Sequence, residues 1–316
     1  MKILVTGGNG FLGKRLGKAM KSKGHEVILA SRNNKQNLHS KKYSGCDFYP
    51  LDITNIESVR DVITDFNPNA IIHGAATKFV DLAEKIPNEA IDVNVLGSQN
   101  IARVAMDKGT DFVIGISTDK ASPPVRNIYG LTKTLMERLF CSLNGKSKTK
   151  FLSVRYGNVA WSTGSVLPIW KKMAEDKGTI GTTGPNMYRY FFTVEEAVGL
   201  VLTAFEHRES LFGKVLSREM KSTQLKEILR VWKDEKDIEI EDLPERPGER
   251  EEEFLIGEPE LEFSTEIVLN NIKHYILDFS KKSDNPLKDV LSSRTAEKLS
   301  KEEILSLINN PPEEEL

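Results

Sequence analysis

A tyrosine and a lysine in this chain are spaced so that they could share one proton-transfer site. Tyr129 and Lys133 lie four residues apart, which on a helix places both side chains on one face. An ammonium beside a tyrosine stabilises the phenolate and is expected to lower the tyrosine pKa from about 10 towards neutrality. The phenolate could then take a proton from a hydroxyl while a hydride leaves. Ser117 and Thr118 close the preceding predicted strand, where a hydroxyl would bind the oxygen that becomes a ketone.

A carboxyl and an amine follow Thr118 directly, as Asp119 and Lys120. Once a hydroxyl-bearing carbon is oxidised to a ketone, the proton on the next carbon becomes acidic. One group could remove that proton while the other protonates a departing hydroxyl, which needs an acid and a base with shifted pKa values side by side. The alternative interpretation is a surface ion pair at the start of a loop.

A glycine-rich turn predicts where the hydride acceptor binds. A strand, KILVT, runs into G-x-x-G-x-x-G and then into a helical pattern. Glycines allow left-handed dihedrals and close approach, so that backbone N–H groups and a helix N-terminus can face a pyrophosphate. A structural turn could also use glycines, but the flanking strand and helix favour a dinucleotide site. TGGNGFLG also resembles the TGxxGxxG signature of extended short-chain dehydrogenase/reductases, and the predicted dinucleotide contacts here are Gly7, Gly10, Phe11, Leu12 and Gly13.

The end of the second predicted strand indicates which dinucleotide is bound. An acidic residue there would hold the ribose 2′-hydroxyl of NAD, but this chain has Ser31 and Arg32. A guanidinium can clamp a 2′-phosphate by charge-assisted hydrogen bonds, so the sequence predicts NADP; a solvated loop arginine is the alternative. By the superfamily resemblance, Asp52 and Ile53 fall where adenine is contacted, and Ala75 and Ala76 where the chain lines the dinucleotide.

Apolar patterning predicts an α/β fold with a doubly wound parallel Rossmann sheet and a smaller C-terminal substrate lobe. Strands are expected at KILVT, EVILA, DFYPL, NAIIHG, DFVIGIS and KFLSVRY, and helices at 10–22, 56–66, 88–108 and 129–142. In the last helix, Leu131, Leu135 and Leu139 are expected to face the core.

The pattern changes after Asn158. Helices are expected at 166–177, 194–206 and 223–231, a strand near Lys214, and a turn at GTIGTTG. The highly charged sequence beyond Pro247 predicts little secondary structure. The final segment, NNPPEEEL, suggests a solvated tail. We therefore divide the chain into an NADP-binding domain, 1–160, and a mixed substrate lobe, 161–316, part of which returns to the core and which ends in an acidic tail.

Composition excludes several classes of protein. The 316 residues carry a formal charge of -2, which gives no sign of nucleic-acid binding, and no apolar run reaches the roughly 20 residues of a membrane span. The start lacks the layout of a signal peptide. Cys46 and Cys141 are far apart and there is no histidine cluster, so we expect neither disulfide nor metal. A cytoplasmic location is expected.

Longer segments resemble the UDP-N-acetylglucosamine 4,6-dehydratases of polysaccharide and pseudaminic-acid biosynthesis. The most specific is ISTDKASPPVRNIYGLTK; others are HGAATKFVDLAEKIPNEAIDVNVLGSQN, VRYGNVAWSTGSVLPIW, MYRYFFTVEEAV, RPGERE and SSRTAEKLSKEEILSLI. The resemblance covers nearly the whole chain.

This resemblance implies a role for each matched residue. It implies Asp119 as the acid for the C6 hydroxyl, Lys120 as the base at C5, Tyr129 as the base for C4 oxidation and Lys133 as its partner, with Thr118 beside them. Tyr129, Lys133 and Lys78 would also contact the cofactor. The substrate would be lined by Lys78, Asn158, Ser165, Arg189, Arg246 and Glu249, with Arg250 as the alternative diphosphate contact.

The chain departs from the family pattern at three places. S-R-G-S becomes Ser162-Thr163-Gly164-Ser165, M-T-R-F-W becomes MYRYF, and R-P-G-E-K becomes RPGER followed by Glu251 and Glu252. These differences bear on the nucleotide and the sugar, while the acid and base residues are kept.

The resemblance implies oxidation at C4, loss of water across C5 and C6, and return of the hydride to C6, giving a 4-keto-6-deoxy sugar nucleotide. The alternatives are a 4-epimerase or reductase on the same fold, which needs no Asp119–Lys120 pair, and a silent NADP-binding regulator. A UDP-linked sugar is the expected substrate. A homo-oligomer is expected, built on helices 88–108 and 129–142.

Overall fold

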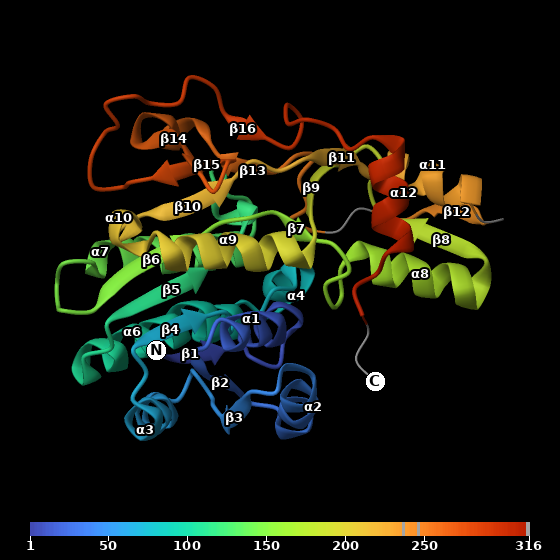
Figure 1. Ribbon diagram of the computed structural model, residues 1–316. Helices are drawn as coiled ribbons and strands as arrows, with labels where there is room; N and C mark the ends of the chain where they lie inside the picture. Colours follow the sequence, from blue (N-terminus) through green and yellow to red (C-terminus); the bar gives the residue numbers. More distant parts are fainter. Residues whose placement is uncertain (236–237, 245–246, 314–316) are drawn as a thin grey trace.

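A nine-stranded sheet forms the centre of the computed structural model, which describes residues 1–235, 238–244 and 247–313 (Figure 1). Its order is β14-β15-β10-β6-β5-β4-β1-β2-β3. The strands from β10 to β3 in this order run parallel to one another, and β15 pairs antiparallel with both β10 and β14. The strands are β1 Lys2–Thr6, β2 Glu26–Ser31, β3 Asp47–Pro50, β4 Ala70–His73, β5 Phe112–Ile116, β6 Lys150–Val154, β10 Val215–Arg218, β14 Ser264–Leu269 and β15 Ile272–Leu277. The strand order reverses between β1 and β4, as in doubly wound folds, which confirms the predicted fold class.

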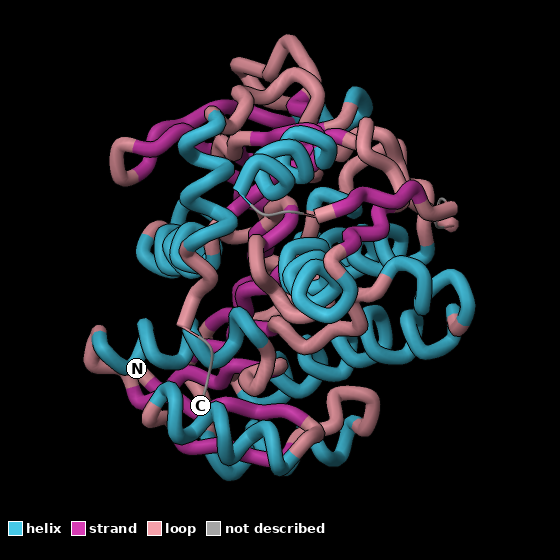
Figure 2. Tube along the Cα trace, turned by 90° about the vertical axis from the view of Figure 1, so that its right-hand side faces the viewer, coloured by secondary structure: helices cyan, strands magenta, loops and turns pink. Residues whose placement is uncertain are grey.

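Helices cover both faces of this sheet because alternate strand residues point to opposite sides. Ile3 and Val5 of β1 pack with α1 and α9, whereas Leu4 packs with α3, α6 and α7. Figure 2 shows the strands between helices on either side. The helices of these layers are α1 Phe11–Ser22, α2 Asn34–Ser44, α3 Ile56–Phe66, α4 Val80–Lys85, α5 Pro87–Ile91, α6 Gly97–Lys108, α7 Ile128–Leu143, α9 Val194–Glu206 and α10 Arg208–Leu211.

The predicted helix 88–108 is interrupted by a π-helical turn at Asp92–Leu96, between α5 and α6. Helix α2 was not predicted, because its sequence carries no apolar stripe; its leucine, Leu38, is exposed in the structure. It is set by its caps instead: the Asn33 side chain accepts a hydrogen bond from the backbone of Gln36, and Gly45 ends the helix at φ +70°.

Helix α7 corrects one prediction. Leu131 and Leu135 are 49% and 54% exposed, and the core-facing row is the one that contains Met136 and Phe140. Leu139 is half-buried. An i, i+4 row of leucines on a helix does not show whether the row faces the core or the surface, since adjacent rows of α7 are both apolar.

A smaller lobe beside the sheet contains all three tryptophans of the chain. Trp161, Trp170 and Trp232 lie in its core. The ring centroid of Trp232 is 6.5 Å from that of Trp161 and 6.4 Å from that of Trp170. Its helices are α8 Val166–Lys177, α11 Leu225–Glu235 and α12 Lys301–Asn309, and its paired strands are β8 Thr179–Thr182 and β12 Glu239–Asp242. GTIGTTG is therefore partly a strand and not only a turn.

The remaining strands join the lobe to the sheet. They are β7 Asn158–Val159, β9 Tyr188–Phe192 and β11 Ser222–Gln224 in one small sheet, and β13 Phe254–Ile256 and β16 Leu291–Ser292 in another; 3₁₀ turns lie at Asp119–Ala121 and Glu258–Phe263. The stretch beyond Pro247 that predicted little thus includes β14 and β15, which extend the central sheet. Among the described residues, none of the helices is long and apolar enough to cross a bilayer.

Candidate active site

A cavity of about 1090 Å³ lies at the carboxyl ends of β1, β4 and β5, where the strand order reverses, and reaches the smaller lobe at α8 and β8. Ligand pockets of roughly 300–1,000 Å³ hold one small molecule. This cavity is therefore at the upper end of the size range of ligand pockets.

The glycine turn after β1 packs closely against its own backbone and the loop after β4. Gly7 has φ +69°, and a Cβ there would lie 2.8 Å from the backbone nitrogen of Ala75. A Cβ on Gly13 would collide with the carbonyl of Gly7. Gly10 donates to the Gly7 carbonyl at 2.9 Å, and α1 begins at the next residue, with Phe11 and Leu12 on the cavity wall. The turn fits the predicted dinucleotide contacts.

Ser31 and Arg32, the residues predicted to contact a ribose phosphate, lie at one end of the cavity. The Ser31 hydroxyl donates to the buried Asn37, whose amide donates back to the Ser31 carbonyl at 3.0 Å. Ser31 is thus held by α2, and Arg32 is exposed at the cavity edge. Asp52 also lines this end; its Oδ1 accepts hydrogen bonds from the backbone and hydroxyl of Thr54.

Two residues at this end were not predicted. Lys14, in α1, lines the cavity, and burial together with the neighbouring Arg15 lowers its pKa to about 8. Ser40, in α2, also lines it and is buried, and its Oγ has no hydrogen-bond partner among the residues described. Lys14 follows the last motif glycine directly, a position that could have identified it, whereas Ser40 sits on a helix that was not predicted. Ile53 is buried against Gly97 at the start of α6.

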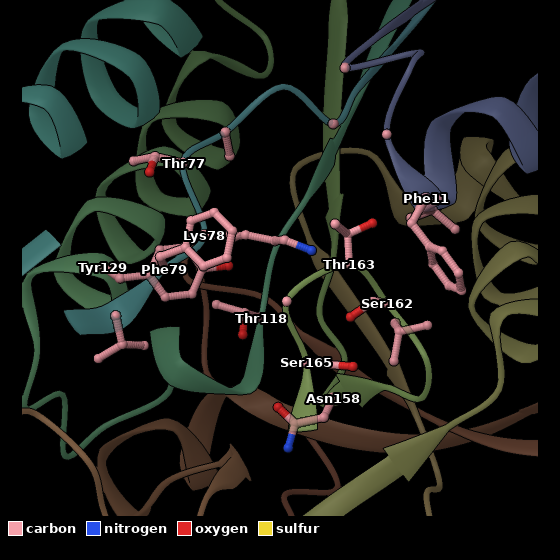
Figure 3. A pocket seen from close by; sticks show the side chains of 18 of the residues that line it. Phe11, Thr77, Lys78, Phe79, Thr118, Tyr129, Asn158, Ser162, Thr163 and Ser165 are labelled. Carbon is pink, nitrogen blue, oxygen red and sulfur yellow. The ribbon is translucent and has the colours of Figure 1, made fainter. Parts of the chain in front are cut away.

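The segment after β4 is held by the π-helical turn. Asn94, which is fully buried, accepts from the backbone of Thr77 at 2.9 Å and donates to the carbonyl of the same residue at 3.0 Å. It also donates to Thr132 of α7. Ala75, Ala76 and Lys78 therefore face the cavity from a fixed loop. Desolvation lowers the pKa of Lys78, and Figure 3 shows its side chain extending into the cavity.

Asp119 follows Thr118 directly and is fully buried; Thr118 (Figure 3) and Lys120 line the cavity, whereas Asp119, predicted to act on the substrate, lies behind that wall. Its Oδ1 accepts from the Thr118 hydroxyl at 3.0 Å and from Lys120 at 3.1 Å. Its Oδ2 is buried and, in the described part of the chain, has no hydrogen-bond partner. Burial raises the pKa of Asp119 although Lys120 opposes the shift. A carboxyl held this way is suited to act as an acid.

The ammonium of Lys120 lies among three oxygen atoms. They belong to Asp119 at 3.1 Å, Asn158 at 3.3 Å and Glu253 at 3.4 Å. Burial by itself lowers the pKa of Lys120, but the carboxylates of Asp119 and Glu253 raise it overall. Lys120 is therefore a cation in this arrangement.

Tyr129 and Lys133 both line the cavity, but the expected lowering of the tyrosine pKa is not seen. Burial raises the pKa of Tyr129 to about 12, with Lys120 and a hydrogen bond to Thr118 acting in the opposite direction. The Lys133 ammonium donates to Met136 at 3.1 Å instead of approaching the phenol. Burial lowers the pKa of Lys133 to about 8, against the effect of Glu137. Desolvation exceeds the charge effect on which the prediction rested.

A buried ion network supports the helix that carries these residues. Arg155, fully buried, contacts both oxygens of Glu137 in α7 at 2.6 and 3.0 Å and both oxygens of Glu260 at 2.8 and 2.9 Å. Glu260 also accepts from the hydroxyl of Ser122. The network connects α7, β6 and the loop after Lys120, so that breaking it would leave unpaired buried charge.

Of the residues predicted to contact the substrate, Asn158, Ser165, Arg189 and Glu249 line the cavity. Ser165 precedes α8, and its buried Oγ has no partner within the described ranges. Glu249 accepts from Thr183 of the GTIGTTG segment at 3.1 Å. Arg246 lies outside the described residues.

Arg250 is not a diphosphate contact. It is buried, does not line the cavity, and donates to the carbonyls of Pro124 at 2.7 Å and of Asp119 at 3.4 Å. Its partner Glu253, which does reach the cavity, was not predicted to have a role. Among the residues described, there is no group of three or more His, Cys, Asp or Glu side chains that could hold a metal ion.

Comparison with known sequences identifies relatives. Residues 3–273 match the family described as polysaccharide biosynthesis proteins. The chain is 36% identical to the capsular polysaccharide biosynthesis protein CapD of Staphylococcus aureus over 95% of its own length, and spans about half (52%) of that protein. It is 34% identical to a UDP-N-acetylglucosamine 4,6-dehydratase (inverting) of Campylobacter jejuni, covering 81% of this chain and 77% of the relative. It is 32% identical to a UDP-glucose 4-epimerase of Rickettsia bellii, covering 82% and 78%.

Solved structures share the fold. Pen from Bacillus thuringiensis superposes with a TM-score of 0.90 at 27% identity, covering 98% of this chain and 97% of that one. A Thermus thermophilus UDP-glucose 4-epimerase in complex with NAD gives 0.69 at 22% identity, over 79% and 89%. The chain therefore belongs to the polysaccharide biosynthesis protein family, alongside the UDP-N-acetylglucosamine 4,6-dehydratases.

Proposed function

We propose that this protein is an NADP-dependent nucleotide-sugar 4,6-dehydratase, with UDP-N-acetylglucosamine as the substrate to test first. The relative from Campylobacter carries that activity in its name. The observation that carries the proposal is the Asp119–Lys120 pair. Lys120 lines the cavity together with Tyr129, and its ammonium lies 3.1 Å from Oδ1 of the buried Asp119, whose Oδ2 has no hydrogen-bond partner among the described residues.

The dinucleotide would lie along the glycine turn, with Gly7, Gly10 and Gly13 at its pyrophosphate and Ser31 and Arg32 at a 2′-phosphate. The glycine turn and the first residues of α1 line the cavity, which supports the fit. When bound, its nicotinamide would supply a hydride acceptor that later returns the hydride. The sugar nucleotide would occupy the other end, between Asn158, Ser165, Arg189 and Glu249.

Tyr129 takes the proton of the C4 hydroxyl, and the hydroxyl of Thr118 holds the same oxygen as it becomes a ketone. The positive charge of Lys120 favours the phenolate over the phenol. Lys133 adds charge once it turns from Met136 towards the tyrosine, a rotation about its own side-chain bonds. The neighbouring C5–H bond then becomes acidic.

One proton on the Asp119–Lys120 pair serves both remaining steps. When Asp119 carries the proton, its carboxyl group is an acid and Lys120 is a neutral amine that can act as a base. When Lys120 carries the proton, the two side chains form an ion pair. Exchange between the two arrangements needs only a transfer across 3.1 Å. Burial favours the uncharged arrangement.

The atoms balance around this pair. The C5 proton passes to Lys120, the C6–O bond breaks, and the oxygen leaves as water with the proton of Asp119. The hydride removed from C4 ends on C6, and Lys120 returns a proton to C5. The proton lost from the C4 hydroxyl replaces the one that Asp119 gave to water, so no net oxidant is needed.

Relatives named UDP-glucose 4-epimerase support a second candidate, an epimerase, on the same fold. Epimerisation at C4 uses Tyr129 and Lys133 and removes no C5 proton. It would leave Asp119 and Lys120 without a chemical task.

Reaction in heavy water with deuterium at C4 of the sugar separates the two candidates. A dehydratase loses water, moves the C4 label to C6 and takes one solvent deuterium at C5, all readable by mass spectrometry and NMR. A product that keeps its 6-hydroxyl, has C4 inverted and carries no solvent deuterium at C5 would identify an epimerase instead.

A further inference from the structure

Glu253 is a second buried carboxylate beside the ammonium of Lys120. It precedes β13, about 130 positions along the chain from Lys120, and is 2% exposed. Its Oε1 lies 3.4 Å from the Lys120 ammonium, and its Oε2 accepts from Arg250. The backbone nitrogen of Glu253 donates to Ser293 at 2.9 Å, which fixes the segment.

Arg250 gives this carboxylate a defined place relative to the catalytic loop. The guanidinium donates to the carbonyls of Asp119, Ser122 and Pro124, all in the loop that carries the acid–base pair. Glu253 therefore contacts one reacting side chain directly and the backbone of the other through Arg250. Glu252, the preceding residue, lies on the surface and pairs with Arg294 at 3.1 Å.

We propose that Glu253 is a positioning residue of the acid–base pair: its carboxylate holds Lys120 against Asp119 and makes Lys120 a stronger base. The effect of Glu253 on turnover rests on the proposed dehydratase function, whereas its effect on the basicity of Lys120 does not depend on that function. A carboxylate 3.4 Å from a buried amine stabilises the cation formed when that amine takes a proton. Glu253 thus assists the step in which Lys120 removes the C5 proton.

The other charges around Lys120 agree with this role. Asp119 on the same turn raises its pKa and Arg189 of β9 lowers it, while Tyr129 of α7 faces it as a neutral phenol. Glu253 itself stays ionised: burial raises its pKa, but Lys120, Arg250 and Arg189 lower it overall. Glu253 also raises the pKa of Asp119. Loss of its charge should therefore lower the pKa of Lys120 and of Asp119 together.

Glu253→Gln is the test, because glutamine keeps an acceptor for Arg250 while removing the charge beside Lys120. Glu252→Gln is the matched control, one residue away and outside the cavity. Competitive labelling with acetic anhydride across a pH series, read on the Lys120 peptide by mass spectrometry, reports the neutral fraction of Lys120 without any turnover. We expect several-fold faster labelling of Lys120 near neutral pH in Glu253→Gln and wild-type labelling in Glu252→Gln.

With a substrate that turns over, both limbs of the kcat/KM pH profile should move to lower pH in Glu253→Gln, a change that a merely structural role would not cause. Unchanged labelling of Lys120 in folded Glu253→Gln overturns the proposal. If Glu253→Gln does not fold, Glu253→Asp tests the proposal instead. Its shorter side chain keeps the negative charge but places it farther from Lys120. The labelling rate of Lys120 should then lie between the wild-type rate and the rate expected without the charge. Altered labelling in a protein that dehydrates no sugar nucleotide would reject the proposed function and keep this inference.

Discussion

Two carboxylates near one lysine carry opposite pKa shifts in this site, and the difference assigns their roles. Asp119 and Glu253 are both buried within 3.5 Å of the Lys120 ammonium. Asp119 has one oxygen without a partner among the described residues and a raised pKa, whereas Glu253 pairs with Arg250 and has a lowered pKa. Surroundings that push two carboxyl pKa values apart suit Asp119 to carry a proton and Glu253 to remain an anion beside the same amine.

Replacing either member of the pair should stop dehydration while dinucleotide binding persists. Asp119→Asn cannot give a proton to the C6 oxygen, and Lys120→Ala cannot remove the C5 proton. Loss of a general acid or base costs about 10²–10⁴-fold in rate, so we expect at least ~100-fold slower product formation. Quenching of protein fluorescence by NADPH provides the binding control. Near-full turnover in either variant contradicts these roles.

Arg32 should determine the choice of dinucleotide. It is exposed at the cavity edge beside Ser31, and no acidic residue occupies this position. Arg32→Ala removes charge-assisted hydrogen bonds worth roughly 1.5–3 kcal/mol, so NADP affinity should fall about 10–100-fold with NAD affinity unchanged. Titration of both dinucleotides by calorimetry measures this. Equal or tighter binding of NAD by the wild type would refute NADP specificity.

Sequence motifs located the reacting side chains but not what surrounds them. Thr118 to Lys120 and Tyr129 with Lys133 are close in sequence, so local spacing predicts that they meet. Asn94 and Glu253 reach the site from distant segments, and spacing carries no sign of those contacts. The tyrosine pKa was predicted wrongly for a related reason, since burial depends on the whole fold.

At the scale of secondary-structure elements, β4 ends in a buried histidine that links β4, β1 and α6 through hydrogen bonds. His73 shares hydrogen bonds with Thr6 of β1 at 2.8 Å and with Ser98 of α6 at 3.0 Å. Thr6 in turn accepts from the backbone of Ala75 at 3.3 Å. Burial, with a contribution from Lys133, lowers the pKa of His73 to about 3. The neutral imidazole thus fixes the loop that lines the dinucleotide.

This histidine predicts an acid-sensitive fold. Because the folded pKa of about 3 lies below the usual 6.5, the unfolded chain binds the proton more readily, and the free energy of unfolding falls as pH drops from about 6.5 towards 3. Between pH 7 and 5 the loss from this group is about 2 kcal/mol. Urea unfolding at both values measures it. His73→Gln should lack this contribution and exposed His39→Gln should keep it; an identical pH slope in all three proteins contradicts the prediction.

Element boundaries followed from apolar runs and were missed where those runs are absent or lie within a charged stretch. The six predicted strands of the first half are all present, and β-branched residues mark the buried ones, such as β1, β4 and β5. Helix α2 has polar caps but no apolar stripe, so periodicity could not find it. β14 and β15 do carry apolar runs, which the charged residues of the surrounding stretch obscured.

At the scale of the molecule, the C-terminal half serves two structures. It adds β10, β15 and β14 to the central sheet and builds the tryptophan-rich lobe that faces the glycine turn across the cavity (Figure 1). Phe11 of the glycine turn packs on the core of that lobe. The cavity therefore has one wall from each half of the chain, and neither half alone would form it.

An apolar surface on α7 and its neighbour predicts a dimer. Leu131 and Leu135 of α7 are 49% and 54% exposed, and Ile91 and Leu96, on the adjoining helical segment, are 42% and 44% exposed. Two-fold pairing of these helices would bury all four residues against their own copies. We expect a dimer or a larger assembly at micromolar concentration by light scattering. Leu135→Glu should shift it towards monomer, whereas Val268→Glu, at a 66% exposed position on β14, should not. A wild-type protein that is monomeric under these conditions, or a Leu135→Glu variant that assembles as the wild type does, would show that this surface is not the interface.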